Sequence, residues 1–209
     1  MKKIMFNDKY GLTQAVLDGR KTMTRRLIPK VGDVNDINWG IGNNGKTMIT
    51  IEAFSWDGLI TEDIYPQYQV GEVVAVAQSY ETIAKEDFTE GFTFDYADWV
   101  INCRNEKGWS NKMFVKSDLM PHQIRIENIR VERLRDISSA DCLAEGILKK
   151  SDFPNKKTCP FYFAGGKHEW DNSFHTPRQA YAALIDKISG KGTWERNPWV
   201  YVYDFKLIK

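Results

Sequence analysis

Three stretches rich in β-branched and aromatic residues constrain the fold of this chain more than any other feature. Residues 70–77 combine a glycine turn with a β-branched run, which is typical of a strand buried on both faces. Residues 123–133 alternate polar and apolar side chains, and the alternation changes phase at Asn128, which predicts a β-bulge nearby. Residues 199–207 form a long aromatic strand. Because helical spacing occurs elsewhere, the sequence predicts a mixed α/β (α+β) fold. The expected strands lie near residues 47–51, 70–77, 92–101, 123–133 and 199–207, and the expected helices near residues 9–18, 138–145 and 177–189.

The ends of two expected helices rest on residues that favour helix caps. Gly19 supplies a left-handed residue that closes the first helix. Ser138 and Asp141 have the spacing of a capping box at the start of the second, and Gly146 closes it. The chain therefore turns directly before residues 20–26 and directly after Glu145.

Of the expected strands, the one near residues 92–101 has the least regular pattern. Phe92, Phe94, Tyr96 and Trp99 follow one another closely, which predicts an aromatic strand. Such aromatic side chains can stack on nucleobases, but in a β-rich domain they more often fill the core. We therefore favour the core.

The stretch from Gly19 to Arg26 carries four cations and two hydroxyl groups, with no acidic residue. In one interpretation the cations form a solvated cap, because positive charge is favoured beyond the C-terminal end of a helix. In the other, Lys21 and Thr24 form a site. Strand side chains alternate between faces, so these two converge only if Lys21 lies in the turn and the strand begins near Met23. Like-charge repulsion would then favour a neutral Lys21 amine, which is a base or a nucleophile. The cations that would repel a charged Lys21 are Arg20, Arg25 and Arg26.

Gly19, Lys21, Thr24 and Arg26 resemble the G-x-K-x-x-[E/T]-x-R signature of the ASCH domain. Further blocks resemble, in the same order, those of phage- and prophage-associated ASCH proteins. Five ordered blocks that extend from end to end are more specific than the eight-residue signature alone. The blocks are Gly-Arg-Lys-Thr-Met-Thr-Arg-Arg at 19–26, Val-Gly-Glu-Val-Val at 70–74, Val-Glu-Arg-Leu-Arg-Asp-Ile-Ser at 131–138, Ala-Glu-Gly-Ile at 144–147 and Asn-Pro-Trp-Val-Tyr-Val at 197–202.

The resemblance implies a small PUA-like/ASCH β-barrel with flanking helices, related to the RNA-binding PUA domain. It also implies an activity, because the ASCH enzyme that acts on N4-acetylcytidine is held to use a lysine, a threonine and a glutamate. By motif these catalytic roles fall on Lys21, Thr24 and Glu145. Glu145 lies in the final turn of its predicted helix, where the helix dipole disfavours a carboxylate, so it is either exposed at small cost or functional. The implied substrate-binding residues are Gly19, Arg20, Arg26 and Gln78.

One block departs from the pattern of the relatives. They commonly carry an arginine-glutamate pair after the 70–76 strand, whereas this chain has Ala77 and Gln78. If that glutamate contributes a charge or a proton relay in the relatives, Gln78 can only donate and accept hydrogen bonds here.

A chain of 209 residues fits one domain with long insertions. We expect a single ASCH domain over residues 1–209, with insertions near 27–69 and 149–173. Asn43-Asn44-Gly45 predicts a hairpin turn in the first insertion. The second region holds Cys159 and His168, with His175 nearby, but not the closely paired ligands of a zinc site, so the sequence predicts no metal and no cofactor.

The net charge is close to zero, since 29 lysines and arginines face 28 acidic residues. Any contact with nucleic acid must therefore rest on a local patch, for which residues 20–26 are the best candidate. Three widely spaced cysteines argue against a disulfide framework, and neither a signal peptide nor a transmembrane segment is recognised. We expect a cytoplasmic protein that binds a modified nucleoside or RNA and no membrane.

Three functions fit these observations. The first is an amidohydrolase that removes an acyl group from N4-acylated cytidine or a related modified nucleoside. The second is a non-catalytic PUA-like module of phage origin that binds RNA or a nucleotide. The third is a phage-derived accessory protein whose pocket has lost activity and whose insertions bind another protein. Lys21, Thr24 and Glu145 favour the first over the third, while Ala77, Gln78 and the two insertions weigh against it.

Overall fold

The computed structural model describes residues 1–28, 37–42, 44–55, 58–90, 94–150, 161–164 and 173–208. These residues form a mixed α+β fold around a five-stranded sheet, which confirms the predicted mixture of helices and strands. The strand order is β1-β6-β7-β11-β2, in which β1 and β6 are parallel and the other neighbours antiparallel. The strands are β1 (Lys3–Ile4), β2 (Met23–Leu27), β6 (Val73–Val76), β7 (Gln123–Arg133) and β11 (Trp199–Leu207).

The five-stranded sheet is open within the described residues. β1 and β2 lie at its two edges, and no pairing between them closes it. β1 is only two residues long, so it offers few backbone groups to a second neighbour. The closed barrel implied by the family resemblance is therefore not found in the described part of the chain.

β7 and β11 lie next to each other in the sheet, and both match their predicted ranges. Their register shifts between Asp204 and Phe205, which pair with Asn128 and Ile126. Glu127 is therefore the extra residue of a β-bulge, which confirms the bulge predicted near Asn128.

β6 is buried on both faces, as the sequence predicts. Val74 and Val76 belong to the main core, which also contains apolar residues of β7, β11 and helix α5 (Pro177–Ser189). Ala75 and Ala77 belong to a smaller cluster that contains Ile83 of helix α2 (Tyr80–Glu90). Because successive side chains point to opposite faces, residues 74–77 contribute alternately to the two clusters.

The expected strand near 47–51 exists, but it does not belong to the main sheet. β4 (Thr47–Ser55) pairs with β3 (Asn38–Ile41) and β5 (Gly58–Ile64) in a separate three-stranded sheet. The predicted hairpin turn joins β3 to β4, with Gly45 at φ +71°, while Asn43 lies outside the described residues. A local apolar pattern predicts a strand but does not specify its partner.

The expected strand near 92–101 is wrong, because these residues belong largely to helix α3 (Phe94–Cys103). Trp99 and Cys103 are four residues apart and therefore share a helix face. The Trp99 ring packs edge-on against Tyr80 of α2, with 5.7 Å between ring centroids. Phe92 lies outside the described residues. Short aromatic runs fit both periods, and here the contact with α2 favours the helix.

The other predicted helices are present. α5 matches its range, whereas α1 (Leu12–Leu17) begins late because Asp8–Tyr10 forms a separate 3-10 turn. α4 (Ser139–Ala144) follows Ser138, whose hydroxyl accepts a hydrogen bond from the Asp141 amide, as the capping spacing predicts. The remaining elements are the 3-10 turns Lys112–Phe114, Ser117–Leu119 and Leu134–Asp136, α6 (Thr193–Arg196), β8 (Leu148–Lys150), β9 (Phe161–Phe163) and β10 (Ser173–Phe174).

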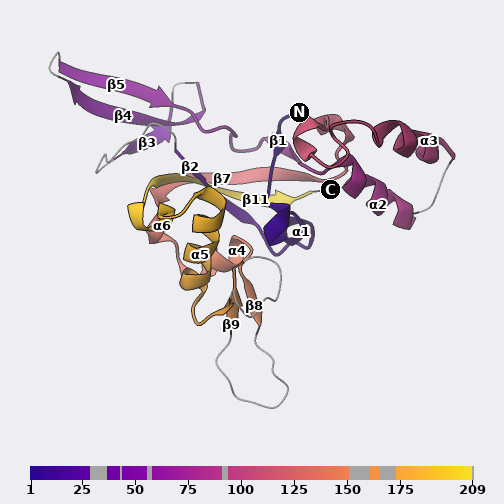
Figure 1. Ribbon diagram of the computed structural model, residues 1–209. Coiled ribbons are helices and arrows are strands. Elements are labelled where there is room, and N and C mark those ends of the chain that lie inside the picture. Colours follow the sequence, from indigo (N-terminus) through magenta and orange to yellow (C-terminus); the bar gives the residue numbers. More distant parts are fainter. Residues whose placement is uncertain are drawn as a thin grey trace.

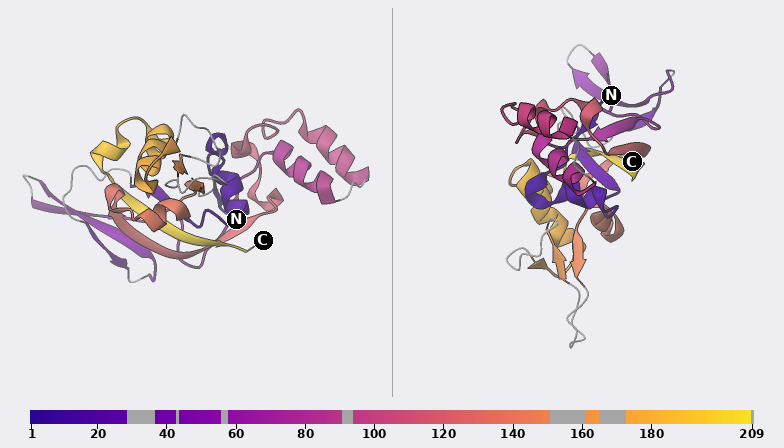
Figure 2. Two further views of the ribbon diagram at one scale, coloured as in Figure 1. Left: turned by 90° about the horizontal axis from the view of Figure 1, so that it is seen from below. Right: turned by 90° about the vertical axis from the view of Figure 1, so that its right-hand side faces the viewer.

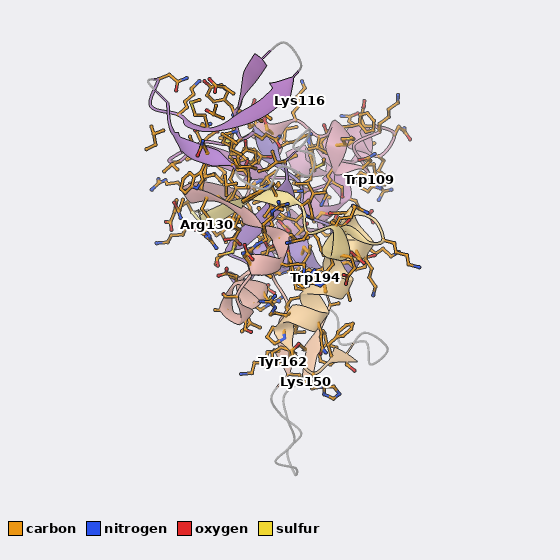
Figure 3. The ribbon with its side chains drawn as sticks, turned by 90° about the vertical axis from the view of Figure 1, so that its left-hand side faces the viewer. Trp109, Lys116, Arg130, Lys150, Tyr162 and Trp194 are labelled. Atoms are coloured by element: carbon orange, nitrogen blue, oxygen red, sulfur yellow. The ribbon has the colours of Figure 1, made fainter. Side chains whose placement is uncertain are left out.

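The helices and strands outside the five-stranded sheet lie around it. The β4–β5 hairpin and the α2–α3 pair lie at opposite ends of the molecule (Figures 1 and 2). α4, α5 and α6 gather beside the sheet, and β8 and β9 project beyond them (Figure 1). Figure 3 shows Lys150 and Tyr162 of that projection far from Lys116. No helix in the described ranges has the length and apolar character needed to cross a membrane.

Candidate functional site

The turn between α1 and β2 has the geometry that a site at Lys21 requires. Gly19 adopts φ +70°, and the Lys21 amide donates to the Ala15 carbonyl at 2.8 Å, which ties the turn to α1. β2 begins only at Met23, so Lys21 precedes the strand. Only Thr24 lies in the strand, so the alternation of strand side chains does not force Lys21 and Thr24 onto opposite faces.

The end of α4 packs directly against this turn. The Thr22 amide donates to the Ala144 carbonyl at 2.9 Å. Gly146, which follows the helix, adopts φ +98°, and a Cβ atom there would lie 3.3 Å from a methyl group of Leu12 and 3.5 Å from the Lys21 Cβ atom. A glycine at this position therefore permits the close approach that brings Glu145 next to Lys21.

Lys21 and Glu145 form a buried ion pair. Lys21 is 2 % exposed, and Glu145 is also buried. Lys21 Nζ donates to Glu145 Oε2 at 2.6 Å, to the Glu145 carbonyl at 2.8 Å and to the Met23 carbonyl at 2.7 Å. All three protons of a lysine ammonium thus have an acceptor.

Burial lowers the pKa of Lys21, and the charges of Arg26 and Arg25 lower it further, while Glu145 opposes the shift. The pKa is lowered in the direction that the sequence predicts, but desolvation rather than like-charge repulsion is the main cause. Arg20 has no part in it: its side chain bonds the Asp18 carboxylate at 2.8 Å near the surface.

A network of charges extends from the buried Glu145 toward the half-buried Glu132, Asp141 and Arg130. Arg25 Nη1 lies 3.3 Å from Glu145 Oε1, and Arg25 Nη2 contacts Glu132 and, at 3.0 Å, Asp141. Arg130, labelled in Figure 3, bonds Glu132 at 3.1 Å and Asp141 at 3.2 Å. The Glu145 carboxylate therefore lies between two cations, Lys21 and Arg25. This arrangement compensates for its unfavourable place at a helix C-terminus.

The pKa shifts in this network follow from its contacts. Burial would lower the pKa of Arg25, but Glu145 and Glu132 raise it above its ordinary value. Burial would raise the pKa of Asp141, but the hydrogen bond and charge of Arg25 lower it. Arg25 and Asp141 therefore stay charged, and the network holds Glu145 in place.

The four motif residues line a single pocket of about 670 Å³. Lys21, Thr24, Arg26 and Glu145 share it with aromatic and apolar side chains from the N-terminal segment and from α5. Thr24 is 5 % exposed, and its hydroxyl has no hydrogen-bond partner among the residues that the structure describes. The further lining residues are Met5, Phe6, Asn7, Asp8, Lys9, Leu12, Arg25, Leu27, Lys112, Tyr181, Leu184, Ile185, Ile188 and Ser189.

Arg26 forms part of the pocket rim. Arg26 Nη2 donates to the Met5 carbonyl at 2.5 Å, and its guanidinium carbon lies 6.0 Å from the centre of the Phe6 ring. Because an arginine side chain has five N–H donors, most of them remain for a ligand.

Three residues implied as substrate-binding are not in this lining: Gly19, Arg20 and Gln78. Gly19 shapes the turn. Gln78 is buried after β6, where its Nε2 donates to Glu86 Oε1 at 2.6 Å and its Oε1 has no partner among the described residues. Glu86 Oε2 in turn lies 3.0 Å from His122 Nε2.

Sequence reasoning missed Tyr181 of α5, which is a lining residue of the pocket. Burial raises the pKa of the Tyr181 hydroxyl well above its ordinary value, and the negative charge of Glu145 adds to the shift. This tyrosine therefore remains protonated. Tyr181 also belongs to the main core, where it is buried with Leu184 and Ile185 of the same helix.

Cys159 and His168 lie outside the described residues, and the described ranges contain no group of three or more potential metal ligands. Comparison with protein-family models, with curated proteins and with solved structures finds no match to this chain.

Proposed function

We propose that the chain is an ASCH-type amidohydrolase that removes the acyl group from the exocyclic nitrogen of N4-acylated cytidine or a related modified nucleoside. The observation that carries the proposal is the meeting of Lys21, Thr24, Arg26 and Glu145 in one pocket, with 2.6 Å between Lys21 Nζ and Glu145 Oε2. A volume of about 670 Å³ lies within the range of small-molecule sites.

In the first half of the reaction, the Lys21–Glu145 pair moves the proton. Transfer from Lys21 Nζ to Glu145 Oε2 yields a neutral amine, which the lowered pKa of Lys21 favours. That amine takes the hydroxyl proton of Thr24 as the threonine oxygen attacks the acyl carbon. Glu145 gives its proton to the departing exocyclic nitrogen, the amide bond breaks, and an acyl-threonine ester remains.

In the second half, water replaces the amine. Lys21 again passes a proton to Glu145, accepts one from the attacking water, and Glu145 returns its proton to the Thr24 oxygen as the ester bond breaks. The products are the deacylated nucleoside and a carboxylic acid, and the three side chains return to their starting states. Arg26, at the rim of the pocket, binds the carbonyl oxygen of the base.

The aromatic lining suits the rest of the ligand. Phe6 and Tyr181 line the pocket from the N-terminal segment and from α5, and aromatic side chains offer apolar contact to a pyrimidine ring. The centre of the Phe6 ring lies 5.7 Å from Lys21 Nζ. A pyrimidine held beside Phe6 would therefore place its N4-acyl group close to the catalytic amine.

One observation favours a non-catalytic binding module as the second candidate. Lys21 Nζ has three acceptors, so the ammonium is fully bonded and has no free donor toward a ligand. In that case the Lys21–Glu145 pair would only shape the pocket wall. The module would bind a nucleotide or RNA without chemistry.

A panel of acylated nucleosides separates the two candidates. The purified protein is incubated with N4-acetylcytidine and with longer N4-acyl and other N-acyl nucleosides, and the deacylated nucleosides are separated from the substrates by chromatography. An amidohydrolase releases cytidine from at least one N4-acyl compound. If every compound stays intact while the protein binds single-stranded RNA tightly, the binding module replaces the enzyme.

A further inference from the structure

A second pocket adjoins the candidate site. Its volume is about 560 Å³, and Met5 and Arg26 line both pockets, so they form the boundary between them. Gln67 and Tyr68 form one wall, and the segment Val115–Ser117 forms another. A ligand with one part in each pocket would therefore lie against Arg26.

The second pocket is basic, and no acidic side chain lines it. Lys2 bonds the Glu72 carboxylate at 3.0 Å. Lys3 donates to three backbone carbonyls, and Arg26 to one. Neither of these two, nor Lys116, forms an ion pair with any residue that the structure describes. The side-chain cations of the lining are Lys2, Lys3, Arg26 and Lys116.

This charge pattern differs from that of the candidate site. There, Lys21 and Arg25 each contact a carboxylate within the pocket wall. Backbone carbonyls orient the Lys3 ammonium but do not neutralise it, so the second pocket keeps a positive potential. An anionic group gains most from that position, because several cations act on it together.

We propose that the second pocket binds the phosphate of a nucleotide whose base occupies the candidate site. The inference rests on the proposed function and names its substrate class: a nucleotide, free or within an oligonucleotide, rather than a free nucleoside. Arg26 lies between the two pockets with several unused donors, the geometry that suits a phosphate oxygen. Lys116 is exposed and adds a point charge at the outer side.

Direct binding tests the phosphate site. Titration calorimetry at low salt compares cytidine, its 5′- and 3′-monophosphates and a short oligocytidylate. At least one phosphorylated compound is expected to bind about tenfold or more tightly than cytidine, and high salt should remove most of this advantage. A further gain for the oligocytidylate identifies a polynucleotide as the source, and equal binding identifies a free nucleotide. Equal affinities for cytidine and all phosphorylated compounds at low salt would overturn the proposal.

Charge variants locate the site. Lys116→Gln should lower the ratio of nucleotide to nucleoside affinity by about threefold, and Lys116→Glu by more. Lys46→Gln is the matched control, since Lys46 is exposed in the β3–β4 turn and lines neither pocket. If Lys46→Gln lowers the ratio as much as Lys116→Gln, the effect comes from net charge and the second pocket is not the site.

The same samples distinguish this inference from the proposed function. If cytidine nucleotides bind more tightly than cytidine but no N4-acyl compound is hydrolysed, the amidohydrolase fails and the phosphate site stands. If N4-acetylcytidine and its phosphates are hydrolysed with equal kcat/KM and bind equally, the amidohydrolase stands and the phosphate site fails.

Discussion

The buried Lys21–Glu145 pair gives a quantitative prediction for stability. The perturbation is a double-mutant cycle with Lys21→Met, Glu145→Gln and the combined variant. Methionine keeps an unbranched side chain of similar length without its charge, and glutamine keeps the shape of the carboxylate. The cycle thus isolates the interaction between Nζ and Oε2, which lie 2.6 Å apart.

The expected magnitudes follow from what each single variant leaves behind. Lys21→Met leaves a buried Glu145 carboxylate that keeps Arg25 at 3.3 Å, so we expect a loss near the lower end of the range for a broken buried pair, about 3 kcal/mol. Glu145→Gln leaves an ammonium with two backbone carbonyls, at a cost of about 2 kcal/mol. The double variant should lose about 2 kcal/mol less than the sum of the two.

Urea unfolding followed by tryptophan fluorescence measures these differences. The exposed pair of Lys85 and Glu81 in α2 is the matched control, because its 2.8 Å contact should couple by less than about 0.5 kcal/mol. If the Lys21–Glu145 coupling is as small as that of the control pair, the two side chains do not share a buried contact and the site geometry is wrong.

Two further predictions concern the surroundings of the pair. The pKa of Asp141 is lowered from 3.8 in the folded state, so its contribution to stability is fully present above that pH and is lost as the pH falls through the folded value. Asp141→Asn should therefore flatten the acid limb of a stability–pH curve, and the same flattening with Asp118→Asn, whose carboxylate is largely exposed, would count against the network. Gly146→Ala should destabilise the fold by about 1 kcal/mol more than Gly71→Ala, because both glycines have positive φ but only Gly146 approaches a neighbour, at 3.3 Å. Thermal unfolding of the two variants measures this difference, and equal losses would show that the turn and α4 are not packed together.

Strict periodicity decided which elements the sequence could predict. β7, β11 and α5 were predicted at their observed bounds because each has a long pattern with one period. β4 was predicted as a strand, but its partners β3 and β5 depend on pairing, which no local pattern encodes. Residues 92–101 failed because spacings of two, three and four residues between aromatic side chains fit a strand and a helix equally well.

The sequence also predicted some residues of the site and missed others. The motif predicted Lys21, Thr24, Arg26 and Glu145, which all line the pocket. The network around Arg25 was missed because its partners Glu132 and Asp141 are 107 and 116 residues away in sequence. Gln78 was expected to bind substrate, yet it is not among the pocket lining residues and pairs with Glu86. Long-range contacts of this kind become visible only once the sheet brings β2, β7 and α4 together.

The release of cytidine from N4-acetylcytidine tests the central claim most directly, when the wild type is measured beside Lys21→Arg, Thr24→Val and Thr24→Ser. Arg20→Lys and Thr22→Ala are the matched controls, since both residues are exposed in the same turn. We predict cytidine from the wild type, from both controls and, more slowly, from Thr24→Ser, and none from Lys21→Arg or Thr24→Val, which lack the proton acceptor and the hydroxyl. Wild-type rates in folded Lys21→Arg and Thr24→Val would contradict the claim.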